Sequence, residues 1–257
     1  MSETGKLRPL GANINAFTLD FEDAWLDEIR ESYRLELSAF LAKPANQYVL
    51  AGGQTLRQAV GPAPSAYYLY SYNNYPLLWF SNNDAATYQT YRRFFDRLEI
   101  EDELKEMVDC QERIIMYCGF LVVGDRAPEY LWHDDYFSGA NAYTLIAPLF
   151  ELAPGHGHLL YAVDERREAQ YHYRLGQAIV LGEKFLHTTE PYAKNDSLRV
   201  LVSMTFGTDK LDYWKRLENS LKGQSRYYLL PCGHVTGTCN CLLKHRYRKL
   251  LSFFKRG

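Results

Sequence analysis

At 257 residues, with 47% hydrophobic and 23% charged residues, the chain is long enough to bury a sizeable core without disulfides. Its formal net charge of −2 gives no overall attraction to nucleic acid or to an anionic membrane, and no apolar run reaches bilayer-spanning length, so we expect no transmembrane segment. The first residues lack the apolar core of a secretory signal, so we expect a cytoplasmic protein whose five cysteines are reduced.

We expect one domain over residues 1–257, made of three regions. Residues 1–110 have a helical or mixed pattern, residues 111–208 are β-rich, and residues 209–257 form a C-terminal helical and Cys-rich tail. The sequence is silent on oligomeric state.

The first region alternates between helical and extended patterns. Residues 20–43 carry apolar side chains at helical spacing, at Leu26, Ile29, Tyr33, Leu37 and Leu41. Residues 66–80 alternate tyrosines at period two and indicate a strand and loop. A second helix is predicted to begin with Asp84 as its cap, to run through Leu98 and to continue after a break to about Asp109.

The second region consists of short β-rich runs separated by Gly, Pro and charged turns. The runs occupy residues 113–123, 140–152, 157–163, 177–182 and 198–207. Many short strands without intervening helices indicate a sandwich or a barrel. A last helix is predicted near residues 209–222, where Leu211, Trp214, Leu217 and Leu221 fall on one face.

Two histidines and one carboxylate in the β-rich region form a candidate metal site. On an extended strand His133 and Asp135 point to the same side, and His187 follows the apolar run that ends at Leu186. Such a set leaves coordination positions open and suits non-heme Fe(II) and O2 chemistry. A histidine and an aspartate two residues apart are more often a hydrogen-bonded surface pair, so the strand context decides. Arg199 follows on a core strand, where a buried cation needs an anion.

These positions resemble the motif of the Fe(II)/2-oxoglutarate-dependent dioxygenases, in which H-x-D/E is followed by a distant His and then by Arg or Lys. The resemblance covers about residues 112–207, and residues 182–207 are similar to the small amino-acid hydroxylases of that family. It implies a mainly β fold with flanking helices around a double-stranded β-helix, the cupin-like jelly-roll. It also implies the following roles: Fe(II) ligands at His133, Asp135 and His187, the distal carboxylate of 2-oxoglutarate at Arg199, and an added hydrogen bond from Ser203 or Tyr143.

The activity that the resemblance implies is hydroxylation of an unactivated C–H bond with release of succinate and CO2. The partners would be O2, 2-oxoglutarate and a small molecule such as an amino acid or a specialised metabolite, with no catalytic residue beyond the metal ligands. Because Asp135 fills the third ligand position, halogenation is disfavoured, whereas desaturation, ring closure and epimerisation stay compatible. The alternatives are a non-catalytic cupin-like or zinc-stabilised binding protein, and a metal-dependent enzyme on the same barrel that does not use 2-oxoglutarate.

Other histidines and the tyrosine run have simpler interpretations. His156 and His158 lie among glycines and are read as part of a turn, and His172 as an edge-strand residue. The tyrosines of residues 66–75 indicate a half-buried strand, and the alternative is the lining of a substrate pocket.

The C-terminal tail gathers three cysteines and one histidine, at Cys232, His234, Cys239 and Cys241. This donor set would suit one structural Zn2+, although the spacing is not that of common zinc ribbons and a loop of reduced cysteines needs no ligand. Residues 242–257 are basic and amphipathic. They indicate a terminal helix with a solvated face, and the alternative is contact with an acidic partner, a carrier protein or a membrane surface.

Overall fold

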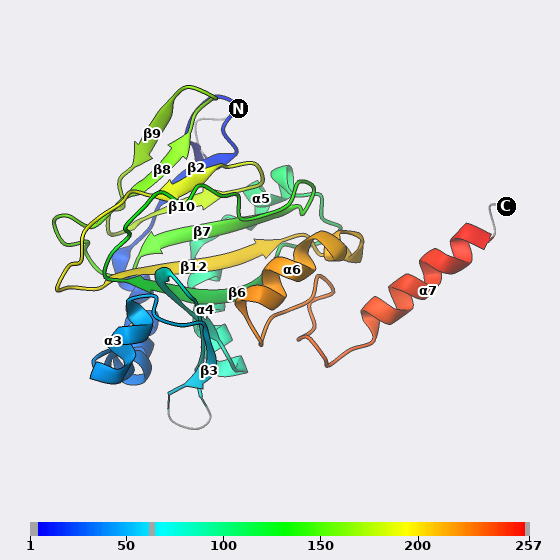
Figure 1. Ribbon diagram of the computed structural model, residues 1–257. Helices are drawn as coiled ribbons and strands as arrows, with labels where there is room; N and C mark the ends of the chain where they lie inside the picture. Colours follow the sequence, from blue (N-terminus) through cyan, green and yellow to red (C-terminus); the bar gives the residue numbers. More distant parts are fainter. Residues whose placement is uncertain (1–4, 62–64, 255–257) are drawn as a thin grey trace.

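Two antiparallel sheets form the framework of the chain (Figure 1). The computed structural model describes residues 5–61 and 65–254. The extreme N-terminus on which the cytoplasmic expectation partly rests, part of the turn before residue 66 and the last three residues of the basic tail lie outside the described residues.

The larger sheet has nine strands, in the order β1 (Arg8–Pro9), β2 (Ala16–Asp20), β10 (Gln177–Leu181), β7 (Ala142–Pro148), β12 (Arg199–Gly207), β6 (Ile115–Gly124), β5 (Tyr75–Asn82), β4 (Tyr67–Tyr72) and β3 (Leu56–Val60). The smaller sheet has three strands, in the order β11 (His187–Thr189), β8 (Leu159–Ala162) and β9 (Glu168–Tyr171).

The strands from β6 to β12 follow the order of a double-stranded β-helix. One layer contains β10, β7, β12 and β6 side by side. The other contains β9, β8 and β11, extended by isolated bridges of Ala127 to Tyr192 and of His133 to His187. The chain passes between the two layers so that β6 and β12, its first and last strands, are neighbours. The predicted jelly-roll is confirmed, with its second strand reduced to those two bridges.

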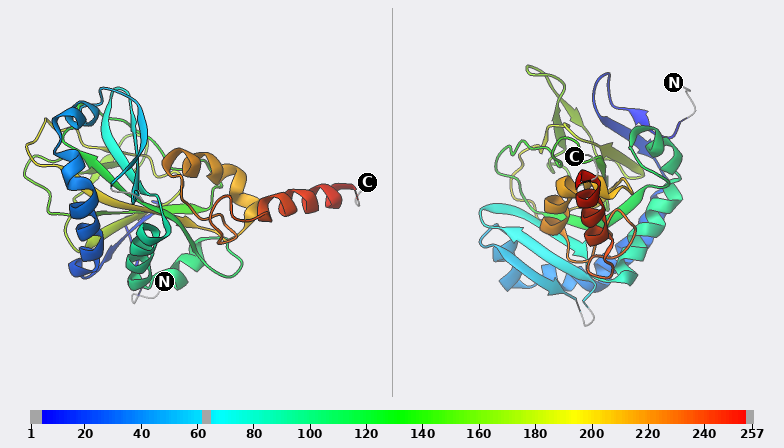
Figure 2. Two further views of the ribbon diagram at one scale, coloured as in Figure 1. Left: turned by 90° about the horizontal axis from the view of Figure 1, so that it is seen from below. Right: turned by 90° about the vertical axis from the view of Figure 1, so that its right-hand side faces the viewer.

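Helical segments from the first region cover one face of the larger sheet (Figures 1 and 2). They are η1 (Asp23–Leu26), α1 (Asp27–Ser32), the π-helical η2 (Tyr33–Leu37), α2 (Ser38–Leu41), α3 (Pro44–Leu50), α4 (Ala85–Leu98) and α5 (Glu101–Met107). Asp84 caps α4 as predicted, because its side chain accepts a hydrogen bond of 2.7 Å from the Thr87 N–H. The predicted helix over residues 20–43 is divided into several turns, and Asp20 belongs to β2 instead.

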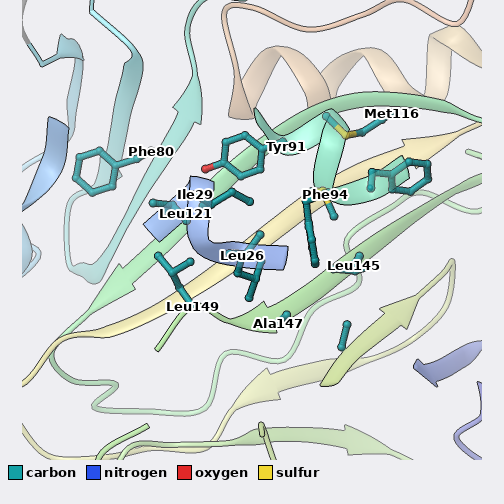
Figure 3. Close-up of a cluster of buried hydrophobic side chains, with 14 of the residues drawn as sticks. Leu26, Ile29, Phe80, Tyr91, Phe94, Met116, Leu121, Leu145, Ala147 and Leu149 are labelled. Atoms are coloured by element: carbon teal, nitrogen blue, oxygen red, sulfur yellow. The ribbon is translucent and has the colours of Figure 1, made fainter. Parts of the chain in front are cut away.

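The main core lies between these helices and the sheet (Figure 3). Leu26 and Ile29 from the first helical segments and Phe94 from α4 pack in one cluster with Leu121 of β6 and Leu145 of β7, and all of them are buried. Burial of such side chains stabilises the fold by roughly 1.5–3 kcal/mol each. The sheet that carries the candidate site is therefore supported across its far face.

The tyrosine run forms a hairpin of β4 and β5, where the sequence predicted a strand and a loop. The turn is made by Asn73 and Asn74, and Asn74 has the left-handed φ of 64° that asparagine tolerates. After β12 come η3 (Leu211–Tyr213), α6 (Trp214–Gln224) and α7 (Cys241–Phe254). The predicted helix over residues 209–222 is thus confirmed from Leu211 onward. Helix α7 projects from the body of the molecule in Figure 1 and in the left view of Figure 2.

Within the described ranges, no helix combines the length and the apolar character that a bilayer crossing requires.

Candidate metal centre

The layer that contains β11 brings His133 and His187 together, and Asp135 follows His133 by two residues. His133 and His187 exchange two backbone hydrogen bonds of 3.0 Å, which fix the segment after β6 against the start of β11. The Asp135 carboxylate oxygen lies 3.7 Å from His133 Nε2 and 3.9 Å from His187 Nε2. The three side chains thus offer one ligand atom each within 4.8 Å of one another.

Hydrogen bonds to backbone carbonyls orient both imidazoles with Nε2 toward Asp135. His133 Nδ1 lies 2.9 Å from the Leu131 carbonyl oxygen, and His187 Nδ1 lies 2.8 Å from that of Phe185. Each Nδ1–H therefore donates to a carbonyl, which leaves the Nε2 lone pair facing Asp135. Burial lowers the pKa of His187 and favours the neutral imidazole that binds a metal.

A single cavity connects the triad to Arg199, on β12. Besides the three ligands, its walls include Arg199, Leu201 and Ser203 from β12, Thr144 and Ile146 from β7, and Tyr75 and Trp79 from β5. Arg199, Leu201 and Ser203 alternate along one strand and so share a face.

The guanidinium of Arg199 is buried with part of its hydrogen-bonding capacity unused. The residue is 2% exposed, Nε donates a 3.0 Å hydrogen bond to the Gly157 carbonyl, and the ring of Tyr173 lies 5.2 Å from the guanidinium carbon. Nη2 finds no hydrogen-bond partner among the residues that the structure describes. An unpaired buried cation is strongly unfavourable, so the cavity is built for a ligand that carries an anionic group to Nη2.

Tyr173 is a cavity residue that the sequence did not single out. Its hydroxyl is buried without a hydrogen-bond partner of normal geometry in the described part of the chain. Burial raises the pKa of Tyr173 to about 12, although the neighbouring Arg199 opposes the shift. The phenol is therefore neutral and has a proton to donate to the same anion.

The structure places Ser203 in the cavity and Tyr143 outside it. Ser203 is 1% exposed and lines the cavity on the same strand as Arg199. Tyr143 faces the opposite side of β7, where its ring stacks on Phe206 and its hydroxyl donates a 3.0 Å hydrogen bond to Asn15. The registers explain the difference, since Tyr143 pairs with Phe206 whereas Thr144 pairs with Thr205, which is on the Ser203 face. Thr144 takes the cavity position expected of Tyr143.

The other histidines of the β-rich region have backbone partners. His156 is 5% exposed, its Nδ1 accepts a hydrogen bond from the Ala153 N–H, and its Nε2 lies 3.0 Å from the Ser197 carbonyl oxygen. His158 Nδ1 accepts a hydrogen bond from the Tyr173 N–H, and its ring packs against that of His172. These interactions fix the loop behind Arg199 and Tyr173.

Both interpretations of the tyrosine run hold in part. Tyr68 and Tyr70 of β4 are buried, as expected for a packed strand. Tyr75 opens β5 and lines the cavity together with Trp79, their rings stacked 5.5 Å apart with planes 6° from parallel. One wall of the candidate site is therefore aromatic.

No protein-family profile and no curated protein sequence matches the chain. It is similar to SnoN, described as a non-heme alpha-ketoglutarate-dependent epimerase from nogalamycin biosynthesis, with 10% identity, a TM-score of 0.49 and coverage of 76% of this chain and 79% of that one. It is also similar to a Pseudomonas putida prolyl-4-hydroxylase, with 13% identity, a TM-score of 0.45 and coverage of 77% of this chain and 94% of that one. A third similar structure is HygX from Streptomyces hygroscopicus, solved with nickel and 2-oxoglutarate bound. Its identity is 11%, its TM-score is 0.46, and the match covers 76% of this chain and 83% of that one.

Proposed function

We propose that the protein is a non-heme Fe(II)- and 2-oxoglutarate-dependent oxygenase. The observation that carries the proposal is the unpaired Nη2 of buried Arg199, in the same cavity as the His133, Asp135 and His187 triad. A metal site alone suits many reactions. A metal site that shares a cavity with an unsatisfied buried cation calls for an anionic co-substrate that reaches the metal at its other end.

The triad fits a ferrous ion by its donor chemistry. Two neutral imidazoles and one carboxylate are the facial set of non-heme Fe(II) oxygenases, and the remaining positions stay open. When bound, iron, 2-oxoglutarate and O2 together supply the oxidising power to replace a substrate C–H bond by C–OH while 2-oxoglutarate becomes succinate and CO2. The Leu131 and Phe185 carbonyls keep the two imidazoles in the tautomer that binds the ion.

Arg199 and Tyr173 would hold the distal carboxylate of 2-oxoglutarate. Arg199 Nη2 is free to form a charge-assisted hydrogen bond, and the neutral Tyr173 hydroxyl is placed to add a second. Ser203 and Thr144 line the same part of the wall and are the candidates for further contacts. Binding by such groups, all buried, would fix the direction from which the co-substrate reaches the metal.

The substrate would be a small molecule that meets the aromatic wall of Tyr75 and Trp79. Stacked rings offer flat apolar surface and some polar edge, which suits a side chain or ring of an amino acid or specialised metabolite. Hydroxylation of an unactivated C–H bond is the reaction that we assign. Desaturation, ring closure and epimerisation use the same protein groups.

The test is anaerobic addition of Fe(II) and 2-oxoglutarate, monitored by the visible charge-transfer absorption of the chelate. We expect the band in the wild-type protein, its loss in Asp135→Ala and its weakening at limiting 2-oxoglutarate in Arg199→Ala. Arg174→Ala, which changes an exposed arginine next to Tyr173, is the matched control and should keep the band. No band in the wild type would reject the proposal, and a band of equal strength in Arg199→Ala would favour a metal enzyme that does not use 2-oxoglutarate.

A further inference from the structure

A second cluster of metal-ligating side chains lies between α6 and α7, apart from the cavity of the triad. It consists of the thiols of Cys232, Cys239 and Cys241 and the imidazole of His234. Their four ligand atoms all lie within 4.8 Å of one another, and the cysteines form no disulfide. The lining of the candidate metal centre includes none of these residues.

The spacing of the sulfur atoms fits coordination to one ion. The Sγ atoms of Cys232 and Cys239 are 3.7 Å apart. A disulfide requires about 2.05 Å. Two thiolates at about 2.3 Å from one tetrahedral Zn2+ are separated by roughly 3.8 Å. The cluster is therefore arranged as ligands of a shared ion would be.

Tight turns bring the four ligands to one point although they are spread over ten residues. Leu230 and His234 are joined by a hydrogen bond of 2.8 Å from the Leu230 N–H to the His234 carbonyl, and the Gly233 N–H bonds back to the Leu230 carbonyl. Gly233 has a φ of 77°, which glycine adopts at no steric cost. The Thr238 N–H and hydroxyl both donate to the Val235 carbonyl, which turns the chain again before Cys239.

The charge near the cluster also suits a bound zinc ion. Three thiolates, a neutral imidazole and Zn2+ together carry one negative charge. The Arg113 guanidinium lies against Gly233, so close that a side chain at that position would collide with it. A cation at this turn would offset part of the negative charge of a zinc-bound site.

The first half of the segment around the cluster is attached to the body. The Asn82 side chain donates a 2.8 Å hydrogen bond to the Tyr227 carbonyl, and the Leu229 N–H donates one of 2.8 Å to the Tyr117 carbonyl. Between the end of α6 at Gln224 and the start of α7 at Cys241, two buried apolar side chains, Tyr228 and Leu230, anchor it in a small core with Trp214. Beyond it, α7 reaches back to the body through ion pairs of Asp212 with His245 at 3.6 Å and with Lys249 at 2.5 Å. These pairs are surface contacts and each contributes at most about 1 kcal/mol.

We propose that Cys232, His234, Cys239 and Cys241 bind one structural Zn2+, which clamps the C-terminal segment and fixes the first turn of α7 to the body. Closed coordination by four protein ligands leaves no position for substrate, so the ion is structural. Because Cys241 is itself the first residue of α7, the ion holds that helix at its N-terminal end.

The test is metal analysis of the full-length protein after loading with zinc and iron. We expect about one Zn2+ per chain in the wild type, its retention in the His133→Ala/His187→Ala double variant and its loss in Cys239→Ser. Cys239→His, which restores a zinc ligand, should recover binding, and Cys110→Ser, a free cysteine elsewhere, should leave it unchanged. Cobalt in place of zinc should give the visible spectrum of tetrahedral thiolate coordination.

A second measurement does not depend on the variants folding. In the wild type, alkylation followed by mass spectrometry should find Cys232, Cys239 and Cys241 protected until a strong chelator is added. Absence of zinc from the loaded wild type, a disulfide between Cys232 and Cys239, or zinc that disappears with the triad variant would each overturn the proposal.

Discussion

The triad and the cysteine cluster are two metal-ligating groups that differ in what holds them in place. The two histidines of the triad are joined by backbone hydrogen bonds within the layer that contains β11, and the main core is packed behind the larger sheet. The cysteine cluster sits on consecutive turns, partly buried against a smaller core that β6 and α6 help to form. In the first case the protein pre-arranges the ligands, and in the second the bound ion would supply much of the order.

This difference separates a site for chemistry from a site for stability. A reactive centre gains from ligands held within a rigid frame while coordination positions stay open. A structural ion gains from closed coordination and contributes its binding free energy to folding. Loss of iron is therefore expected to stop turnover while the fold stays intact. Loss of zinc is expected to make the C-terminal segment more mobile while the jelly-roll stays intact.

The largest effect is expected from Asp135→Ala. Removal of the one carboxylate of the triad should reduce succinate formation by at least about a hundredfold, more than the loss of an outer partner of a ligand typically costs. The melting temperature without metal should stay close to that of the wild type, because the frame does not depend on the ion. Asp134→Ala removes the neighbouring exposed carboxylate and is the matched control. Equal loss in both variants would mean that the ligand assignment is wrong.

The next effect concerns Arg199→Met, which replaces a buried cation by an apolar chain of comparable length. The 2-oxoglutarate concentration for half-maximal rate should rise by about a hundredfold, as for the loss of one member of a buried charge pair. Thermal unfolding adds a readout that is independent of turnover: 2-oxoglutarate with Mn(II) should raise the melting temperature of the wild type and not of the variant. An equal rise in both would place the anion elsewhere.

Structural features that depend only on residues close together in the sequence were predicted well. The Asp84 cap and the five β-rich runs follow from local periodicity and spacing. The approach of Asp135 to His133 does not follow from strand periodicity, because Asp135 lies in a bend after the His133 bridge. The jelly-roll and the meeting of His187 with the other two ligands followed from the family resemblance, and the strand order confirms the fold.

Features that depend on pairing between distant strands were missed. The choice between Tyr143 and Thr144 depends on the register of β7 against β12, and a shift of one residue exchanges the two faces. Strand β2 pairs with β10, about 160 residues away, and no local pattern in residues 16–20 indicates it. Tyr173 lies outside the regular strands, so periodicity gave no reason to place it beside Arg199.

A smaller effect, confined to the tail, is expected when a chelator removes zinc while iron is kept away. Amide hydrogen exchange in residues 226–240 should become faster by about tenfold or more, because local opening no longer breaks the metal bonds. Exchange in β10 and β12 should not change, since neither strand contributes to the core against which Cys232 and Cys239 pack. Faster exchange in those strands would show that the two regions are energetically coupled.

The smallest expected effect is a pH dependence of thermal stability that arises from a buried histidine of the jelly-roll. Burial lowers the pKa of His156 from its ordinary 6.5, and its Nδ1 already accepts a hydrogen bond from the Ala153 N–H. The unfolded chain therefore binds a proton more readily, so the stability from neutral His156 is full above about pH 6.5 and is lost as pH falls toward the lowered folded value. His156→Asn keeps an acceptor and cannot titrate. The drop in melting temperature from pH 7.5 to 5.5 should shrink by about 1–3 °C in this variant. A drop in melting temperature that is as large in His156→Asn as in the wild type would contradict this prediction.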